Sequence, residues 1–414
     1  MRAVLSDPAV TFPAMARFRL DPTPAQQVLL REQCAHARFV WNLALEQRLM
    51  WRPGRGPTPG YNELCAQLTE ARAANPWLAA GSQTVQQQAL RDLDQAFTFF
   101  LARTHRRPTW RKQGTHEGFR IVGAQALRVR HDNRRWSRIC VPKVGWVRFK
   151  RSRDLPDWKS YRITQDKAGR WHIAFAAIPE PIAGPGTGAV VGVDRGVTVA
   201  AALSTGELTS PAGLRPKEAE RLLRLQRRLA RAQRGSNRRA KLKTQLARLH
   251  ARIADRRKDW VEKTSTDLAR RFDEIHVEDL KVAAMTRSAK GTLERPGRNV
   301  AQKAGLNRGI LKAGWAALIT RVVDKAPGRV VTFNPAFTSQ TCHACKHIAK
   351  ESRKSQARFC CVACGHQDHA DVNSSCNLKS APTAAGLVVA ARRDMADVGR
   401  SMKREPQRAT SFGI

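Results

Sequence analysis

Four cysteines in the C-terminal part of the sequence have the spacing of a metal site. They form two Cys-x-x-Cys pairs, Cys342 with Cys345 and Cys361 with Cys364, separated by a basic loop. Two such pairs can place four thiolates at the corners of a tetrahedron, which suits Zn²⁺. Because protein ligands would fill all four positions, we expect one structural zinc ion that takes no part in a reaction. Disulfides are the alternative, but nothing in the sequence points to an oxidising compartment.

Acidic residues beside apolar stretches are the second feature that could carry chemistry. Asp194 interrupts the apolar segment 189–207, Glu278 and Asp279 follow a short apolar run, and Asp371 lies seven residues beyond the last paired cysteine. A carboxylate in a buried strand costs free energy unless it binds a metal or a partner. Carboxylate oxygens suit Mg²⁺ or Mn²⁺. The chemistry of the residues alone does not choose between Glu278 and Asp279.

The C-terminal motifs resemble the zinc ribbon and third RuvC motif of the TnpB nucleases, which transposons encode, and of the miniature type V CRISPR effectors. In chain order, the resemblance is carried by TSQTC, a CxxC pair, the RxFxCxxCG motif (Arg358, Phe359, Cys361, Cys364, Gly365) and the DxN motif (Asp371, Asn373). It predicts two acidic motifs upstream, and both are present. It extends over residues 15–379.

The resemblance implies a nuclease whose catalytic carboxylates are Asp194, Glu278 and Asp371, with Asp279 as a neighbour of the second. They would ligate two Mg²⁺ or Mn²⁺ ions in each active site, on a ribonuclease-H-like mixed sheet that brings them together. Such a pair of ions activates a water molecule and stabilises the leaving oxygen when a phosphodiester is cleaved. We therefore expect a Mg²⁺-dependent endodeoxyribonuclease.

The ribbon and the third motif hold four histidines. Many relatives carry an arginine just before the third aspartate, whereas this chain has His369 and Ala370 at those positions. Either His369 takes a similar phosphate-facing role, or that contact is absent. Because four cysteines are available for zinc, we expect His343, His347 and His366 to be surface groups or to support the ligands rather than to bind metal.

The charge of the chain indicates a polyanionic partner. Lys and Arg number 74 against 34 Asp and Glu, which gives a net charge of +40 and an isoelectric point near 11.3. A guide–target hybrid of about 20 base pairs carries about 40 phosphates, so one such duplex could occupy most of this charge. The sequence shows no long apolar span, lipidation motif or signal peptide. We expect no membrane partner and a location in a prokaryotic cytoplasm, on the nucleoid when DNA is bound.

Hydrophobic periodicity predicts the elements that must position these residues. A period typical of helices covers residues 25–49, 61–74, 84–104 and 303–324, and alternation over 117–178 predicts several short strands. We expect the tryptophans near these strands, Trp110, Trp136, Trp146 and Trp171, to lie in the core.

Together these elements indicate a multidomain α+β protein. It would consist of an antiparallel, wedge-like β-barrel with an inserted helical recognition bundle, then a ribonuclease-H-like (RuvC) α/β nuclease domain with an inserted four-cysteine zinc ribbon. The expected divisions are a disordered leader at 1–14, the barrel at 15–20 plus 105–180, the helical recognition lobe at 21–104, a linker at 181–188, the nuclease domain at 189–337, the zinc ribbon at 338–366, the third motif at 367–379 and a basic, partly disordered tail at 380–414.

Residues 217–260 within the nuclease domain predict a helical hairpin with one apolar stripe on each helix. Its other faces are nearly all Arg and Lys, and charge of one sign repels itself without a counter-ion. A solvated surface hairpin is the alternative, but we favour a nucleic-acid contact. The residues expected to make it are Arg227, Arg228, Arg231, Arg234, Arg238, Arg239, Lys241 and Lys243.

The leading functional hypothesis is an RNA-guided DNA endonuclease that binds a guide RNA and cleaves double-stranded target DNA beside a short flanking motif. It would act as a monomer or as a homodimer on one guide, and either a transposon or a CRISPR system could encode it. A guide-dependent DNA-binding regulator with an inactive nuclease site is one alternative. An unguided transposase or resolvase is another.

Overall fold

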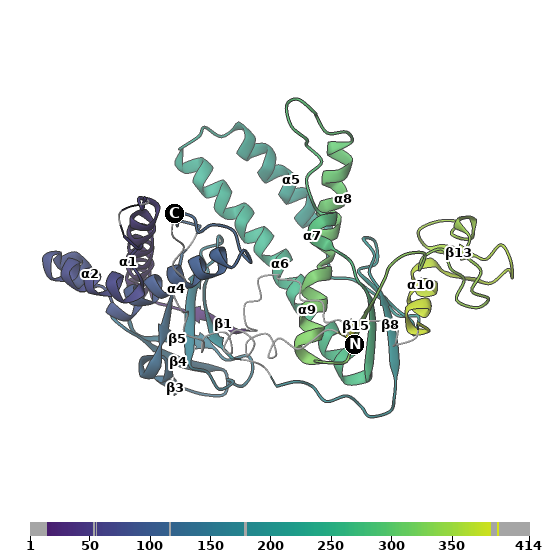
Figure 1. Ribbon diagram of the computed structural model, residues 1–414, viewed down its shortest axis with the longest axis horizontal. Coiled ribbons are helices and arrows are strands. Elements are labelled where there is room, and N and C mark those ends of the chain that lie inside the picture. The colour runs from purple at the N-terminus through teal and green to yellow at the C-terminus, as the bar shows by residue number, and fades with distance from the viewer. Residues whose placement is uncertain are drawn as a thin grey trace, which may run out of the picture. The chain divides into compact units, whose positions relative to one another are not determined.

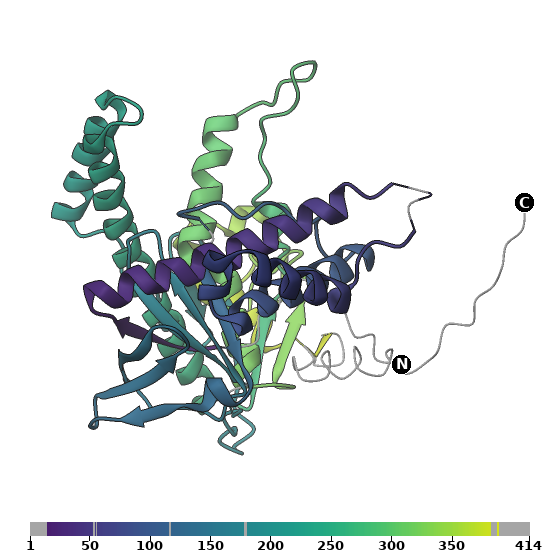
Figure 2. The ribbon, with the colours of Figure 1, turned by 90° about the vertical axis from the view of Figure 1, so that its left-hand side faces the viewer.

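The computed structural model describes residues 15–52, 54, 56–115, 117–177, 180–381 and 387–388 (Figures 1 and 2). They divide into two compact units, one within residues 8–179 and 220–249, the other within 180–219 and 250–414. The expected leader at 1–14 and most of the expected tail at 380–414 lie outside the described residues.

The first unit is built on a seven-stranded antiparallel sheet in the order β2-β6-β7-β1-β5-β4-β3. Its strands are β1 (Met15–Asp21), β2 (Gly118–Val122), β3 (Val129–His131), β4 (Trp136–Val141), β5 (Gly145–Lys150), β6 (Ser160–Gln165) and β7 (Trp171–Ala176). Apolar and basic residues alternate along them, so one face is buried. Phe18, Phe149 and Phe175 pack together on that face, with ring centroids 5.7–5.8 Å apart. The predicted run of short strands is confirmed.

Four helices connect β1 to β2 and share the core of the sheet: α1 (Pro24–Leu49), α2 (Tyr61–Ala74), α3 (Pro76–Ala80) and α4 (Gln83–Leu101). Helix α1 begins with a capping box between Thr23 and Gln26, whose side chains satisfy backbone amides of the first turn. Leu30 and Leu45 of α1 are fully buried with the strand residues. Figure 2 shows these helices gathered beside the strands. The helices predicted over 25–49, 61–74 and 84–104 are confirmed to within a few residues.

The second unit contains a six-stranded mixed sheet in the order β10-β9-β8-β11-β12-β15. Its strands are β8 (Val190–Asp194), β9 (Ala201–Leu203), β10 (Leu208–Thr209), β11 (Glu274–Glu278), β12 (Val330–Phe333) and β15 (Leu387–Val388). Strands β8, β11 and β12 are parallel, whereas β9 runs antiparallel to β8 and β15 antiparallel to β12. Most residues of the central strands β8, β11 and β12 are buried, because helices cover both of their faces. The mixed sheet with flanking helices is confirmed.

The helices that follow β10 are α5 (Pro216–Arg231), α6 (Asn237–Arg271), α7 (Val282–Met285), α8 (Val300–Ala313), α9 (Trp315–Lys325) and α10 (Ala370–Lys379). Residues 220–249, which hold most of α5 and the start of α6, group with the first unit, and the other helices belong to the second. The single helix predicted over 303–324 is wrong. Gly314 adopts a left-handed conformation (φ 79°) and separates α8 from α9, because a glycine of this conformation ends a helix without steric cost.

The two faces of β8 meet different helices. Val191 and Val193 pack in a core with Trp260 of α6 and Leu318 of α9. Gly192 points to the opposite face because successive strand residues alternate, and a Cβ there would collide with the carbonyl oxygen of Ser375 in α10. Helix α10 therefore packs directly against the backbone of β8 (Figure 1). In the part of the chain that the structure describes, no helix is both long and apolar enough to cross a membrane.

Candidate active site and metal centre

Two of the three predicted carboxylates lie side by side at the ends of parallel strands. Val193 in β8 and Val277 in β11 are register partners, so Asp194 and Glu278 follow at equivalent positions on neighbouring strands. Neighbouring strands are about 4.8 Å apart, and partner side chains point to the same face. Asp194 is 9% exposed and Glu278 8%. The fold therefore brings two buried carboxyl groups together.

The third carboxylate comes from the first turn of α10. Asp371 is buried, and its Oδ2 lies 3.4 Å from the position that a Cβ on Gly196 would take, two residues beyond Asp194. Because α10 packs on the face of β8 that carries Gly192 and Asp194, Asp371 reaches the same end of the sheet. The structure thus gathers Asp194, Glu278 and Asp371, which are widely separated in the sequence.

When no cation is bound, burial and mutual repulsion favour the protonated form of the carboxyl groups in this cluster. Burial, followed by the nearby charges of Glu278 and Asp371, raises the pKa of Asp194 from 3.8 to about 7. Burial also raises the pKa of Glu278, opposed by a hydrogen bond from Thr338 and by the charge of Arg195. Carboxyl groups that repel one another this strongly gain from a shared cation.

Three side chains position these carboxylates. Thr338 Oγ1 donates to Glu278 Oε1 at 2.9 Å, and Arg353 Nη2 donates to Asp371 Oδ1 at 3.0 Å. The buried guanidinium of Arg195 donates to the backbone carbonyl of Glu278. Sequence reasoning missed Arg353, since an arginine in a basic ribbon carries no distinguishing signal. It places a guanidinium beside the third aspartate in a chain that lacks the arginine expected just before that residue.

His369 has a local role. It is the N-cap residue of α10, and its Nδ1 accepts a hydrogen bond of 3.3 Å from the backbone N–H of Asp371.

The geometry also separates Glu278 from Asp279, which the residue chemistry could not do. Asp279 is outside the strand and pairs with Lys281 at 2.9 Å, with its side chain 34% exposed, whereas Glu278 is the buried strand residue beside Asp194.

The four cysteines form a compact cluster. The Sγ atoms of Cys342 and Cys364 are 3.8 Å apart and those of Cys345 and Cys361 are 3.6 Å apart. All four sulfur atoms lie within 4.8 Å of one another. Ligands around a tetrahedral zinc ion with ordinary Zn–S bonds are about 3.8 Å apart, so the cluster has the dimensions of a zinc site.

The cysteine ribbon is tied to the carboxylates through α10. Its two short strands, β13 (Arg358–Cys360) and β14 (Gln367–His369), pair antiparallel, and β14 leads directly into α10. Buried Asn373 accepts from the backbone N–H of His343 at 2.9 Å and donates to the carbonyl of Thr341 at 2.7 Å. The asparagine of the DxN motif therefore joins the first cysteine pair to the helix that carries Asp371.

The basic hairpin consists of α5 and α6, which pack through Leu225, Leu242 and Leu246. Seven of its predicted nucleic-acid contacts are exposed: Arg227, Arg228, Arg231, Arg234, Arg238, Lys241 and Lys243. None of these seven side chains forms an ion pair or hydrogen bond with another described residue. Arg239 differs, because its Nη1 donates to the carbonyls of Leu229 (2.7 Å) and Ala232 (2.9 Å) at the end of α5.

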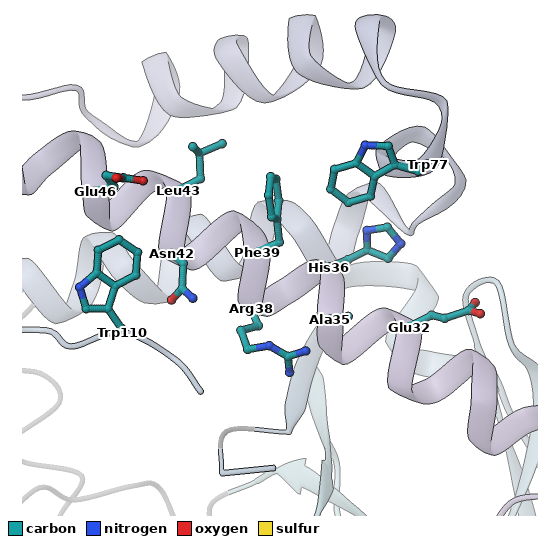
Figure 3. A pocket seen from close by; sticks show the side chains of 10 residues that line it. All are labelled: Glu32, Ala35, His36, Arg38, Phe39, Asn42, Leu43, Glu46, Trp77 and Trp110. Atoms are coloured by element: carbon teal, nitrogen blue, oxygen red, sulfur yellow. The ribbon is translucent and has the colours of Figure 1, made fainter. Parts of the chain in front are cut away.

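A groove along α1 exposes aromatic side chains (Figure 3). Trp77 stacks on His36 with centroids 5.7 Å apart and meets the edge of Phe39 at 4.9 Å. The prediction that Trp110 is a core residue is wrong. It is 43% exposed, because the side chain of Asn42 holds the backbone of Arg111 and leaves the indole facing the groove.

The other tryptophans differ in burial. Trp171 is buried, as predicted. Trp136 and Trp146 are half-buried, and their outer faces are covered by Arg148 and Arg130 at 4.2 and 4.3 Å from the ring centroids.

Three family models match parts of the chain. The OrfB/IS605 model, described as "Probable transposase", matches residues 173–289. The model described as "Cas12f1-like, TNB domain" matches residues 315–378, and one described as "Helix-turn-helix domain" matches residues 15–55. In the structure, the last of these ranges contains strand β1 and helix α1.

Relatives match over nearly the whole length. "Putative RNA-guided DNA endonuclease InsQ" of Escherichia coli (strain K12) is 35% identical over 397 residues, which cover 94% of this chain and 96% of the relative. A "Putative RNA-guided DNA endonuclease" of Streptomyces pristinaespiralis is 31% identical, with 95% and 96% covered.

A solved structure shares the fold. The cryo-EM structure of a Cas12f1–sgRNA–target DNA complex matches with a TM-score of 0.50 at 14% identity, covering 86% of this chain and 82% of that one. The full-length sequence similarity, rather than this fold similarity, decides the family: the chain belongs to the OrfB/TnpB family.

Proposed function

We propose that this protein is an RNA-guided DNA endonuclease that binds a guide RNA, recognises a short motif beside its target and cleaves DNA. Relatives with this description match it over nearly the full length. The observation that carries the proposal is the convergence of Asp194, Glu278 and Asp371 at one end of the mixed sheet. A regulator that only bound DNA would have no need of three buried, mutually repelling carboxyl groups.

Asp194, Glu278 and Asp371 would be the catalytic residues and would hold two Mg²⁺ or Mn²⁺ ions. Their all-oxygen donor set suits these ions, which when bound activate water and stabilise the leaving oxygen of a phosphodiester. Thr338 orients the Glu278 carboxylate through one oxygen and leaves the other available as a ligand. Arg353 holds Asp371 and adds positive charge beside the cluster. The strand order β10-β9-β8-β11-β12 supports a ribonuclease-H-like sheet.

The cysteine cluster would bind one structural zinc ion through Cys342, Cys345, Cys361 and Cys364. Its sulfur spacing and the match to the Cas12f1-like domain support this assignment. The ion would fix the ribbon, and through Asn373 the start of α10, without an open coordination position for substrate.

Guide RNA and double-stranded target DNA would bind the basic surfaces. The seven exposed basic side chains of the α5–α6 hairpin suit phosphates, and exposed Trp77, Phe39 and Trp110 suit stacking of unpaired bases. For the first unit we propose the expected barrel. Tyr161 Oη in β6 donates to the carbonyl of Cys140 in β4 at 3.1 Å, and such a link across the core supports a strongly curved sheet.

The test is to purify the protein with its native flanking DNA from a bacterial host and to sequence the RNA that co-purifies. Target DNA matching that RNA is then offered to the wild type and to the Asp194→Ala variant. We expect both to retain the RNA and only the wild type to cleave. Cleavage by Asp194→Ala would contradict the assignment of the active site.

The RNA also separates the alternatives. RNA copied from the end of the protein's own element indicates a transposon-encoded nuclease, and RNA with a repeat–spacer structure indicates a CRISPR effector. If no discrete RNA survives a salt wash, the guided function is refuted and an unguided transposase becomes the better explanation. Retained RNA and target binding without cleavage in the wild type would indicate a regulator.

A further inference from the structure

A second group of potential metal ligands lies in the ribbon, composed of residues distinct from the four cysteines. His343 lies between the cysteines of the first pair, His366 follows the second pair, and Asp368 is in β14. Asp368 Oδ2 lies 4.0 Å from His343 Nδ1 and 4.0 Å from His366 Nε2. One donor atom from each residue lies within 4.8 Å of the other two.

One buried ring nitrogen of this group lacks a hydrogen-bond partner among the described residues. His366 Nε2 is buried and has no hydrogen-bond partner among the described residues. A buried ring nitrogen without a partner costs free energy, and a metal ion is one way to satisfy it. His343 Nδ1 lies 3.3 Å from Asn373 Oδ1. This contact is long, and Asn373 Oδ1 also accepts a hydrogen bond of 2.9 Å from the backbone N–H of His343, so His343 Nδ1 can exchange its contact with Asn373 for a metal ion.

We propose that His343, His366 and Asp368 form a second metal site, which binds Zn²⁺ or a similar transition-metal ion. Two imidazoles and one carboxylate suit such an ion and not Mg²⁺, which prefers oxygen ligands. Nitrogen and oxygen ligands on tetrahedral zinc are about 3.3 Å apart, so each 4.0 Å separation needs to close by less than 1 Å. Three protein ligands leave a fourth position for water. All three side chains are partly exposed, so an ion can enter from solvent.

Metal binding at this site would affect the carboxylate cluster, because the site lies close to Asp371 in the chain. It would connect the first cysteine pair, through His343, to β14, through Asp368, which lies three residues before Asp371. A bound ion would therefore reinforce the link that Asn373 makes between the ribbon and α10. This consequence rests on the proposed nuclease function, whereas the metal site itself does not.

The experiment compares the full-length wild type with His366→Ala and with His347→Ala, a matched control because His347 is exposed in the same ribbon outside the group. Each protein is equilibrated with excess Zn²⁺, desalted and analysed for zinc per chain by mass spectrometry. We expect His366→Ala to hold one equivalent fewer than the wild type and His347→Ala. Any zinc bound by Asp194, Glu278 and Asp371 is present in all three proteins and therefore does not contribute to the difference between them. Equal zinc content in all three proteins would overturn the proposal.

Substitution with Co²⁺ gives a second readout. Thiolate ligands produce intense ligand-to-metal charge-transfer bands, whereas a His–His–Asp site produces only weak ligand-field bands. His366→Ala should retain the charge-transfer bands, which shows that the ribbon is folded, and should lose the weak component. If it loses the charge-transfer bands as well, Asp368→Asn replaces it in both measurements. Because no nucleic acid is involved, a protein that binds the additional zinc but cleaves nothing would refute the nuclease and not the site.

Discussion

The buried Asp194 makes the stability of the protein depend on pH when Mg²⁺ is absent. The pKa of Asp194 is about 7 in the folded chain and 3.8 in its ordinary state. As pH rises between these values, the unfolded chain releases the proton while the folded chain keeps it, so folding loses stability. The loss is complete above about pH 7 and is on the order of 4 kcal/mol.

We therefore predict that thermal unfolding in Mg²⁺-free buffer shifts to lower temperature between about pH 4 and about pH 7. Asp194→Asn should reduce this slope, while Glu278, whose pKa is also raised by burial, keeps part of it, and added Mg²⁺ should restore stability at the upper end of the range. Asp279→Asn is the control, because Asp279 is partly exposed and paired with Lys281. An unchanged slope in Asp194→Asn would contradict the prediction.

Arg353 should set the pH at which the carboxylates become available for metal. Its charge lowers the pKa of both Asp194 and Glu278, so Arg353→Ala should raise both values. We expect the pH–rate profile for DNA cleavage to move to higher pH, with a lower rate at neutral pH and partial recovery when the pH is raised. Arg358→Ala changes an exposed arginine of the same ribbon and should leave the profile in place. A uniform loss of rate at every pH would indicate a different role for Arg353.

At the scale of elements, the α5–α6 hairpin contains arginines that we expect to bind nucleic acid and one, Arg239, that we expect to stabilise the hairpin itself. Each phosphate contact contributes about 0.9 to the slope of log affinity against log salt on duplex DNA. Replacing Arg227, Arg228 and Arg231 by alanine should therefore reduce this slope by up to about 3 without changing the unfolding temperature. Fluorescence anisotropy over a salt series measures it.

Arg239→Ala provides the comparison. Its guanidinium donates to the last carbonyls of α5, so we expect this variant to lower helical stability in thermal unfolding and to change the salt slope by about 1 or less. Equal salt slopes in the triple variant and the wild type would exclude the hairpin as a nucleic-acid contact.

What the sequence could predict depended on how local the information was. Cysteine spacing and helical periodicity are local, so the cysteine cluster and α2 (Tyr61–Ala74) followed directly. The chemistry of the residues did not choose Glu278 over Asp279; the family resemblance assigned Glu278, and its register with β8 supplies the physical reason. The convergence of His343 with His366 required the folded ribbon. Arg353 reaches Asp371 only because the ribbon folds back to α10. The break at Gly314 was missed because a single glycine within an apolar period is compatible with a continuous helix.

At the scale of the whole molecule, a net charge of +40 opposes folding of the free protein. Self-repulsion destabilises a compact state, and salt screens it. We predict that the RNA-free protein unfolds at a higher temperature as NaCl is increased, and that a guide-length RNA at low salt gives a similar or larger increase. A neutral osmolyte of equal osmolality is the control for solvent effects. An unfolding temperature that falls with added salt would mean that attractive ion pairs outweigh the repulsion.

The contact between Gly192 of β8 and the backbone of α10 has a consequence for how such chains can diverge. Main-chain atoms meet there, so the separation of the first and third carboxylates does not depend on the size of any intervening side chain. The chain that links β12 to α10 can then be lengthened at positions away from Thr338 and Arg353 while the carboxylates keep their spacing. We expect foreign domains inserted at exposed positions of this ribbon to be tolerated, whereas adding a single methyl group at Gly192 should separate the helix from the sheet.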